Sequence, residues 1–143
     1  LDLRQELGLT YVLISHNLAV VEHIATRVAV MYLGRIVEIG PVREVIRNPK
    51  HPYTVGLMRS IPSMREDVDR LYQIEGSMPR LDAIPPGCPF HPRCPHAFAR
   101  CPRERPELLE TGGASRAACW LYDRANPPPP EAAEGRADAL GRA

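Results

Sequence analysis

The sequence lacks a long run of apolar residues, and this excludes a membrane-spanning helix within it. Its longest uninterrupted apolar run, residues 28–33, is far shorter than the roughly 20 residues that a spanning helix needs. It also has no basic leader followed by a signal-type apolar core, so we expect no secretory segment. Any association with a membrane is therefore expected to come through a partner, without direct insertion.

Excess charge of either sign is missing as well. The chain has 18 basic and 17 acidic residues and a net charge of +1, so no overall field favours nucleic acid or an anionic membrane surface. Arginines between residues 80 and 120 alternate with acidic residues and form no basic stripe of the kind that binds a phosphate backbone. We expect no nucleic-acid partner.

The N-terminal residues predict a strand followed by a helix. Residues 1–7 are typical of a helix end that stops at Gly8, and the β-prone run 10–14 is typical of a strand buried in a parallel sheet. From Asn17, a favourable N-cap, apolar residues recur at helical spacing. His16 lies at this junction, where open α/β sheets gather ligands. It is therefore a candidate binding residue, with a capping or surface histidine as the alternative.

Two short strands and two helices are predicted next. The strands cover residues 28–33 and 35–39 around a tight turn at Gly34, and the helices cover residues 41–47 and 52–60. Beyond these the pattern weakens, although residues 71–74 are compatible with a strand. We place the main boundary near Pro62 and interpret the Pro-rich residues 125–143 as a disordered tail.

All four cysteines lie in a loop-like, proline-rich stretch: Cys88, Cys94, Cys101 and Cys119. Such a stretch has few apolar residues for a core, and metal binding can supply folding free energy instead. Without signs of export, four cysteines favour metal ligation over disulfides.

The spacing of these cysteines differs from that of a zinc ribbon. Five, six and seventeen residues separate successive cysteines, whereas zinc ribbons use paired CxxC motifs. All-thiolate ligation suits zinc or an iron–sulfur cluster, and wide, irregular spacing fits a bulky cluster better than one ion. Four free buried thiols are the alternative without metal. Arg93, Arg100 and Arg116 are candidates to offset the charge of a thiolate centre.

Several segments resemble one family in the same order. TYVLISHNLAVVEHIATRVAVMYLGRIVEIGP resembles the end of an ABC-transporter nucleotide-binding domain. NPKHPYTVGLMRSIP, GCPFHPRCPHAFARC and ACW resemble the C-terminal extension of ATP-binding subunits from oligopeptide and dipeptide importers. The resemblance implies an α/β fold: the C-terminal part of a P-loop NTPase domain over residues 1–62, then an irregular cysteine-rich extension over residues 63–124.

The resemblance also implies site residues and partners. His16 would contact the γ-phosphate of ATP, bound with Mg²⁺, and help to hold the attacking water. Cys88, Cys94, Cys101 and Cys119 would hold a 4Fe–4S cluster, with zinc as the alternative and His91 or His96 as substitute ligands. Expected partners are transmembrane permease subunits and a second ATP-binding subunit, and the expected location is the cytoplasmic face of the bacterial membrane, as a peripheral protein.

Most nucleotide-site motifs are missing from these 143 residues. The only lysine, Lys50, lies outside any Gly-x4-Gly-Lys-Ser/Thr P-loop, and we find neither an LSGGQ-like signature nor an apolar strand ending in Asp-Glu. We therefore expect that this chain alone neither binds ATP tightly nor hydrolyses it. The alternative function is a stand-alone cysteine-rich, metal-binding interaction module.

Overall fold

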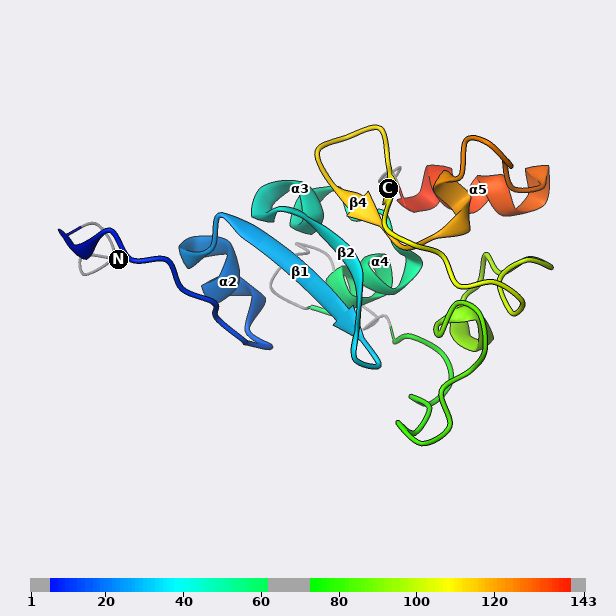
Figure 1. Ribbon diagram of the computed structural model, residues 1–143, viewed down its shortest axis with the longest axis horizontal. Coiled ribbons are helices and arrows are strands. Elements are labelled where there is room, and N and C mark those ends of the chain that lie inside the picture. The colour runs from blue at the N-terminus through cyan, green and yellow to red at the C-terminus, as the bar shows by residue number, and fades with distance from the viewer. Residues whose placement is uncertain (1–5, 62–72, 140–143) are drawn as a thin grey trace.

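A four-stranded antiparallel sheet lies at the centre of the molecule. The computed structural model describes residues 6–61 and 73–139. Strands β1 (Arg27–Tyr32) and β2 (Arg35–Pro41) form a long hairpin, and the short strands β3 (Leu109–Glu110) and β4 (Arg116–Ala117) extend it in the order β1-β2-β4-β3 (Figure 1). The cysteine-rich half of the chain thus adds two strands to a sheet that the first half begins.

The β1–β2 hairpin turns at two residues with positive φ. Leu33 has φ 46° and Gly34 has φ 77°, which are the values of a two-residue type I′ turn. Tyr32 and Arg35 pair directly on either side of it. The two strands and the turn predicted from the sequence are confirmed.

The described helices lie beside the sheet and pack against one another. They are α2 (Leu18–Ile24), α3 (Val42–Arg47), α4 (Pro52–Arg59) and α5 (Pro130–Ala139), with 3-10 turns at His91–Arg93 and Trp120–Tyr122. The predicted N-cap forms, because the Asn17 side chain accepts a hydrogen bond of 3.3 Å from the N–H of Val20. The apolar faces of α2, α3 and α4 meet at Val21, Ile46 and Met58.

The main core joins the two halves of the sequence. Val30, Tyr32 and Val37 of the hairpin pack against Cys88, Phe90 and Cys101 of the cysteine-rich loops. The rings of Tyr32 and Phe90 meet edge to face, with centroids 5.4 Å apart and planes at 86°. The boundary expected near Pro62 lies outside the described residues, and the chain on both sides of that gap shares one sheet and one core.

The strand predicted at residues 10–14 does not form. These residues have no regular structure, and Val12 and Ile14 are 91% and 95% exposed. The prediction of a buried parallel strand is wrong for this chain, because such a strand needs neighbours and the described sheet holds only antiparallel pairs. Before it, Glu6 and Leu7 are helical and Gly8 has φ 61°.

The C-terminal tail contains a helix in place of the expected disorder. In α5, Ala132 is only 6% exposed and packs with Leu121 and Tyr122. The prediction of disorder was wrong over Pro130–Ala139, because alanine and glutamate are good helix formers and a proline is tolerated in the first turn. Gln73 and Ile74 are irregular, and the rest of the strand considered at 71–74 lies outside the described residues.

None of the helices among the described residues has the length and apolar character needed to cross a membrane.

Candidate functional site: the cysteine cavity and its anchor

The four cysteines line one small cavity. It measures about 10 Å³, and His91 and His96 also line it. Such a space holds about one water-sized sphere. All four cysteines are free thiols, three of them buried. Tertiary structure thus brings together thiols that are up to 31 positions apart in the sequence, from Cys88 to Cys119.

A close backbone contact positions two of them. The N–H of Cys88 donates a 2.8 Å hydrogen bond to the carbonyl of Cys101. Gly87, with φ 70°, precedes this contact, and a Cβ there would overlap the backbone of Cys101 and Pro102. Only glycine fits both the left-handed conformation and the close approach.

Burial favours the protonated form of three of the thiols. It raises the pKa of Cys88, raises that of Cys94 to about 12, and raises that of Cys119 well above the ordinary value, and neighbouring thiols add to each shift. Opposing this, backbone N–H groups point at each of these sulfurs, from His96 at Cys94 and from Leu121 at Cys119. A metal would therefore have to displace protons, but N–H donors are already placed to support thiolates.

The arginines considered as counter-charges are engaged elsewhere. Arg93 donates to the carbonyls of residues 74–76. Arg100 donates at 2.7 Å to Asp123, whose pKa this hydrogen bond lowers, and Arg116 donates at 2.7 Å to a glutamate of β3. Each of these three arginines is therefore held by a partner other than the thiols.

The arrangement does not match a mononuclear metal site. Among the residues with described positions, no group of three or more His, Cys, Asp or Glu side chains could hold a metal ion. A zinc ion would need sulfurs at about 2.3 Å. The Nδ1 of His91 lies 2.8 Å from the carbonyl oxygen of Cys88, which leaves Nε2 as the ring nitrogen that could act as a substitute ligand.

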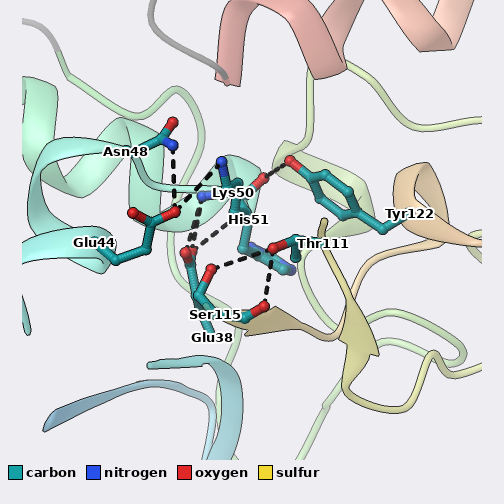
Figure 2. Close-up of polar contacts among 8 residues, drawn as sticks. All are labelled: Glu38, Glu44, Asn48, Lys50, His51, Thr111, Ser115 and Tyr122. Carbon is teal, nitrogen blue, oxygen red and sulfur yellow. Dashed lines mark hydrogen bonds and ion pairs between the residues drawn. The ribbon is translucent and has the colours of Figure 1, made fainter. Parts of the chain in front are cut away.

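A buried carboxylate anchors the segment beside this cavity. Glu38 of β2 is fully buried, and its oxygens accept hydrogen bonds from the N–H of Lys50 at 2.9 and 3.1 Å and from the N–H of His51 at 2.9 Å (Figure 2). Burial raises the pKa of Glu38, and these backbone donors partly offset the rise. The Thr54 hydroxyl lies beside the carboxylate and also favours its charged form, without reaching hydrogen-bond geometry.

The same segment contacts the end of the cysteine-rich region. The Tyr122 hydroxyl donates to the carbonyl of Lys50 at 2.7 Å, across 72 positions of sequence (Figure 2). His51 is 1% exposed, and its Nδ1 accepts from the N–H of Tyr53 at 3.0 Å, which caps α4. Burial lowers the pKa of His51 to about 3, so this imidazole is neutral.

Sequence reasoning missed this anchor. It placed Glu38 in a predicted strand and gave neither Glu38 nor His51 a role. One signal was available: Glu38 is a charged residue between apolar neighbours in the strand RIVEIG, and a buried carboxylate requires partners.

The structure leaves His16 apart from the cysteines. His16 is exposed in the irregular segment before α2, and the N-terminal segment with α2 lies on the other side of the β1–β2 hairpin from the loops of residues 88–101 (Figure 1). Next to it, the Ser15 hydroxyl accepts from the N–H of Asn17 at 3.0 Å. The role of His16 toward ATP stays a prediction.

Comparison with known proteins points to one family. Residues 37–101 match the family described as "Oligopeptide/dipeptide transporter, C-terminal region". The dipeptide transport ATP-binding protein DppF of Escherichia coli is 47% identical over 126 residues, 87% of this chain and 37% of that protein. The oligopeptide transport ATP-binding protein AppD of Bacillus subtilis is 43% identical over 122 residues, 85% of this chain and 37% of that protein.

A more distant relative agrees with these two. The dipeptide transport ATP-binding protein DppD of Caldanaerobacter subterraneus is 37% identical over 126 residues, 88% of this chain and 39% of that protein. The chain spans well under half the length of these curated relatives. It belongs to the oligopeptide/dipeptide transporter ATP-binding proteins and corresponds to their C-terminal part, so the family resemblance read from the sequence is confirmed.

Proposed function

We propose that this chain is the C-terminal part of an ATP-binding subunit that energises ABC-type import of oligopeptides or dipeptides. The family match over residues 37–101, which contains the HPYT segment and three of the four cysteines, carries the proposal. In the complete protein a P-loop NTPase domain would bind ATP with Mg²⁺, and His16 would contact the γ-phosphate. The His16 side chain is exposed in this chain, so its imidazole is accessible to such a ligand.

The partners follow from this proposal. Transmembrane permease subunits and a second ATP-binding subunit would complete the importer at the cytoplasmic face of the bacterial membrane. This chain would be peripheral there and make contact through its partners. The peptide itself would bind the permease side, so nothing in this chain selects among peptides.

A stand-alone cysteine-rich module is the weaker alternative. Such a module would have a core of its own, whereas Cys88, Phe90 and Cys101 pack against Val30 and Tyr32 of the hairpin. Strand β4 also pairs with β2. The cysteine region is thus built onto the α/β part, as expected for an extension of an ATP-binding domain.

The test of function is ATP hydrolysis, with His16→Ala as the paired variant. We expect the 143-residue chain to show no turnover, because it has no P-loop, signature or Mg²⁺ carboxylates. Turnover that survives purification and disappears in His16→Ala would contradict this. The coding DNA upstream of Leu1 gives a second test: an in-frame P-loop and signature support the transporter subunit, and an unrelated reading frame opposes it.

For the cysteine cavity we propose a 4Fe–4S cluster on Cys88, Cys94, Cys101 and Cys119. The support is a chemically uniform set of four thiols around one cavity, together with backbone N–H groups directed at three of the sulfurs. The wide, irregular spacing of the four cysteines along the sequence favours a polyatomic group over a single zinc ion. A cluster bound here would tie the proline-rich loops into one shape, which is a structural role.

Anaerobic purification followed by metal analysis decides the cofactor. We expect iron and acid-labile sulfide in about a 4:4 ratio per chain, with visible charge-transfer absorption. Stoichiometric zinc without iron or sulfide would refute the cluster and support zinc. A metal-free chain with four alkylatable thiols would refute both.

A further inference from the structure

Cys119 reaches the cavity from a different part of the chain than its three companions. Cys88, Cys94 and Cys101 lie within fourteen residues and are joined by local hydrogen bonds, such as that from the N–H of Cys94 to the carbonyl of His91 at 3.3 Å. Cys119 follows only after the β3–β4 hairpin. Its place beside the other thiols therefore has to be set by contacts between distant parts of the sequence.

The contacts on both sides of Cys119 lead to the first half of the chain. Before it, the N–H of Ala118 donates to the carbonyl of Val37 at 2.7 Å. After it, the hydroxyl of Tyr122 donates to the carbonyl of Lys50 at 2.7 Å in a buried position. Residues one and three positions from Cys119 are thus fixed to β2 and to the segment before α4.

The His51 side chain contacts both the start of α4 and the stretch that carries Cys119. Its Nδ1 accepts from the N–H of Tyr53, so the hydrogen-bond pattern assigns the ring proton to Nε2. The imidazole also lies beside the backbone of Ala118, and its ring lines the cysteine cavity together with Cys119 and Leu121. One side chain therefore caps α4 and contacts the residue directly before Cys119.

We propose that His51 is a positioning residue for Cys119: held by Glu38 through its backbone, it fixes the Ala118–Tyr122 stretch so that the fourth thiol faces the other three. A second contact, the hydrogen bond from the Tyr122 hydroxyl to the carbonyl of Lys50, holds the other end of this stretch (Figure 2). We call these two contacts, together with the Glu38 carboxylate that holds Lys50 and His51, the clamp. The proposal concerns the placement of a thiol of this chain, and it stands whether the cavity holds a cluster, zinc or no metal.

Thiol alkylation tests the proposal on the chain as purified. Cleavage after arginine puts the four cysteines on four separate peptides, so iodoacetamide modification of each one can be followed by mass spectrometry. The variant is His51→Asn, which keeps a good N-cap for α4 but cannot present the Nε2 proton to Ala118. The matched control is His23→Asn, since His23 is exposed on α2.

We expect Cys119 in His51→Asn to react about fivefold faster or more than in the wild type, because the stretch that carries Cys119 loses its contact with the imidazole and opens more often. The other three cysteines should change by less than about twofold, the size of an effect that leaves their own hydrogen bonds in place, and His23→Asn should change none. An unchanged rate at Cys119, or an equal rise at all four cysteines with a native circular dichroism spectrum, would overturn the proposal.

A second variant covers the case in which His51→Asn does not fold. Tyr122→Phe keeps the buried ring and removes only the hydroxyl that donates to Lys50. A selective rise at Cys119 in this variant supports the clamp, and wild-type protection of Cys119 refutes it. The metal analysis described above is independent of both results, so failure of the cluster proposal and failure of the clamp can be told apart.

Discussion

Removal of the Glu38 carboxylate is the sharpest test of what holds the segment of Lys50 and His51 to strand β2. Glu38→Ala leaves the N–H groups of Lys50 and His51 without their acceptor in a fully buried place. Each buried donor left unsatisfied costs about 1–3 kcal/mol, which gives a gross loss of about 2–6 kcal/mol.

Part of that loss is offset. Burial raises the pKa of Glu38, which means that the folded chain carries a desolvation cost for this charge, and the alanine variant is relieved of it. We therefore expect a net loss of about 3 kcal/mol in the free energy of unfolding, a large share of the 5–15 kcal/mol that is typical of a domain.

Urea unfolding followed by circular dichroism measures this loss. The matched control is Glu22→Ala, because Glu22 forms a partly exposed ion pair of 3.6 Å with Arg47, and its loss should cost less than about 1 kcal/mol. Glu38→Gln should lie between the two, since it keeps one acceptor oxygen. If Glu38→Ala costs less than about 1 kcal/mol, or no more than Glu22→Ala, the carboxylate is not the anchor.

Three further predictions concern other close contacts in the fold. Gly87→Ala should speed alkylation of Cys88, because a Cβ at residue 87 would overlap the backbone of Cys101. The control is Gly34→Ala, which also has a positive φ but open space around it and should leave the rate unchanged. Equal alkylation rates in the two variants would show that the contact with Cys101 is unimportant. Gly40→Ala puts a Cβ 2.7 Å from that of Ser115 and should cost about 1–3 kcal/mol and speed hydrogen exchange in β4; unchanged exchange contradicts this. Burial lowers the pKa of His51 from 6.5 to about 3, so between these values the unfolded chain binds a proton at His51 and the folded chain does not. The stability that comes from burying the neutral imidazole is therefore fully present above pH 6.5 and is lost as the pH falls toward 3. The stability gap between wild type and His51→Asn should narrow by about 2–3 kcal/mol from pH 7 to pH 4.5, and a constant gap in urea unfolding would refute it.

Sequence patterns predicted the local elements of this chain well. The N-cap at Asn17, the Gly34 turn and helices α3 and α4 formed as expected, because each depends on neighbouring residues only. The strand at residues 10–14 failed for the opposite reason: its β-prone composition was read correctly, but a parallel strand exists only when other strands flank it, and the described residues supply none. The helix α5 was missed because one buried alanine against Leu121 and Tyr122 carries no visible pattern.

The sequence by itself determined the family and the chemical type of the cysteine set, since both depend on residue identity and order. Tertiary structure decided which groups meet. It placed Cys119 beside Cys88, Cys94 and Cys101, engaged the candidate arginines elsewhere, and revealed Glu38 as the acceptor that joins the segment of Lys50 and His51 to β2. The physical reason is that a buried hydrogen bond between residues 12 or 72 positions apart depends on the packing of the whole chain. A charged residue in an apolar strand signals that a partner is needed, but the local sequence does not identify that partner.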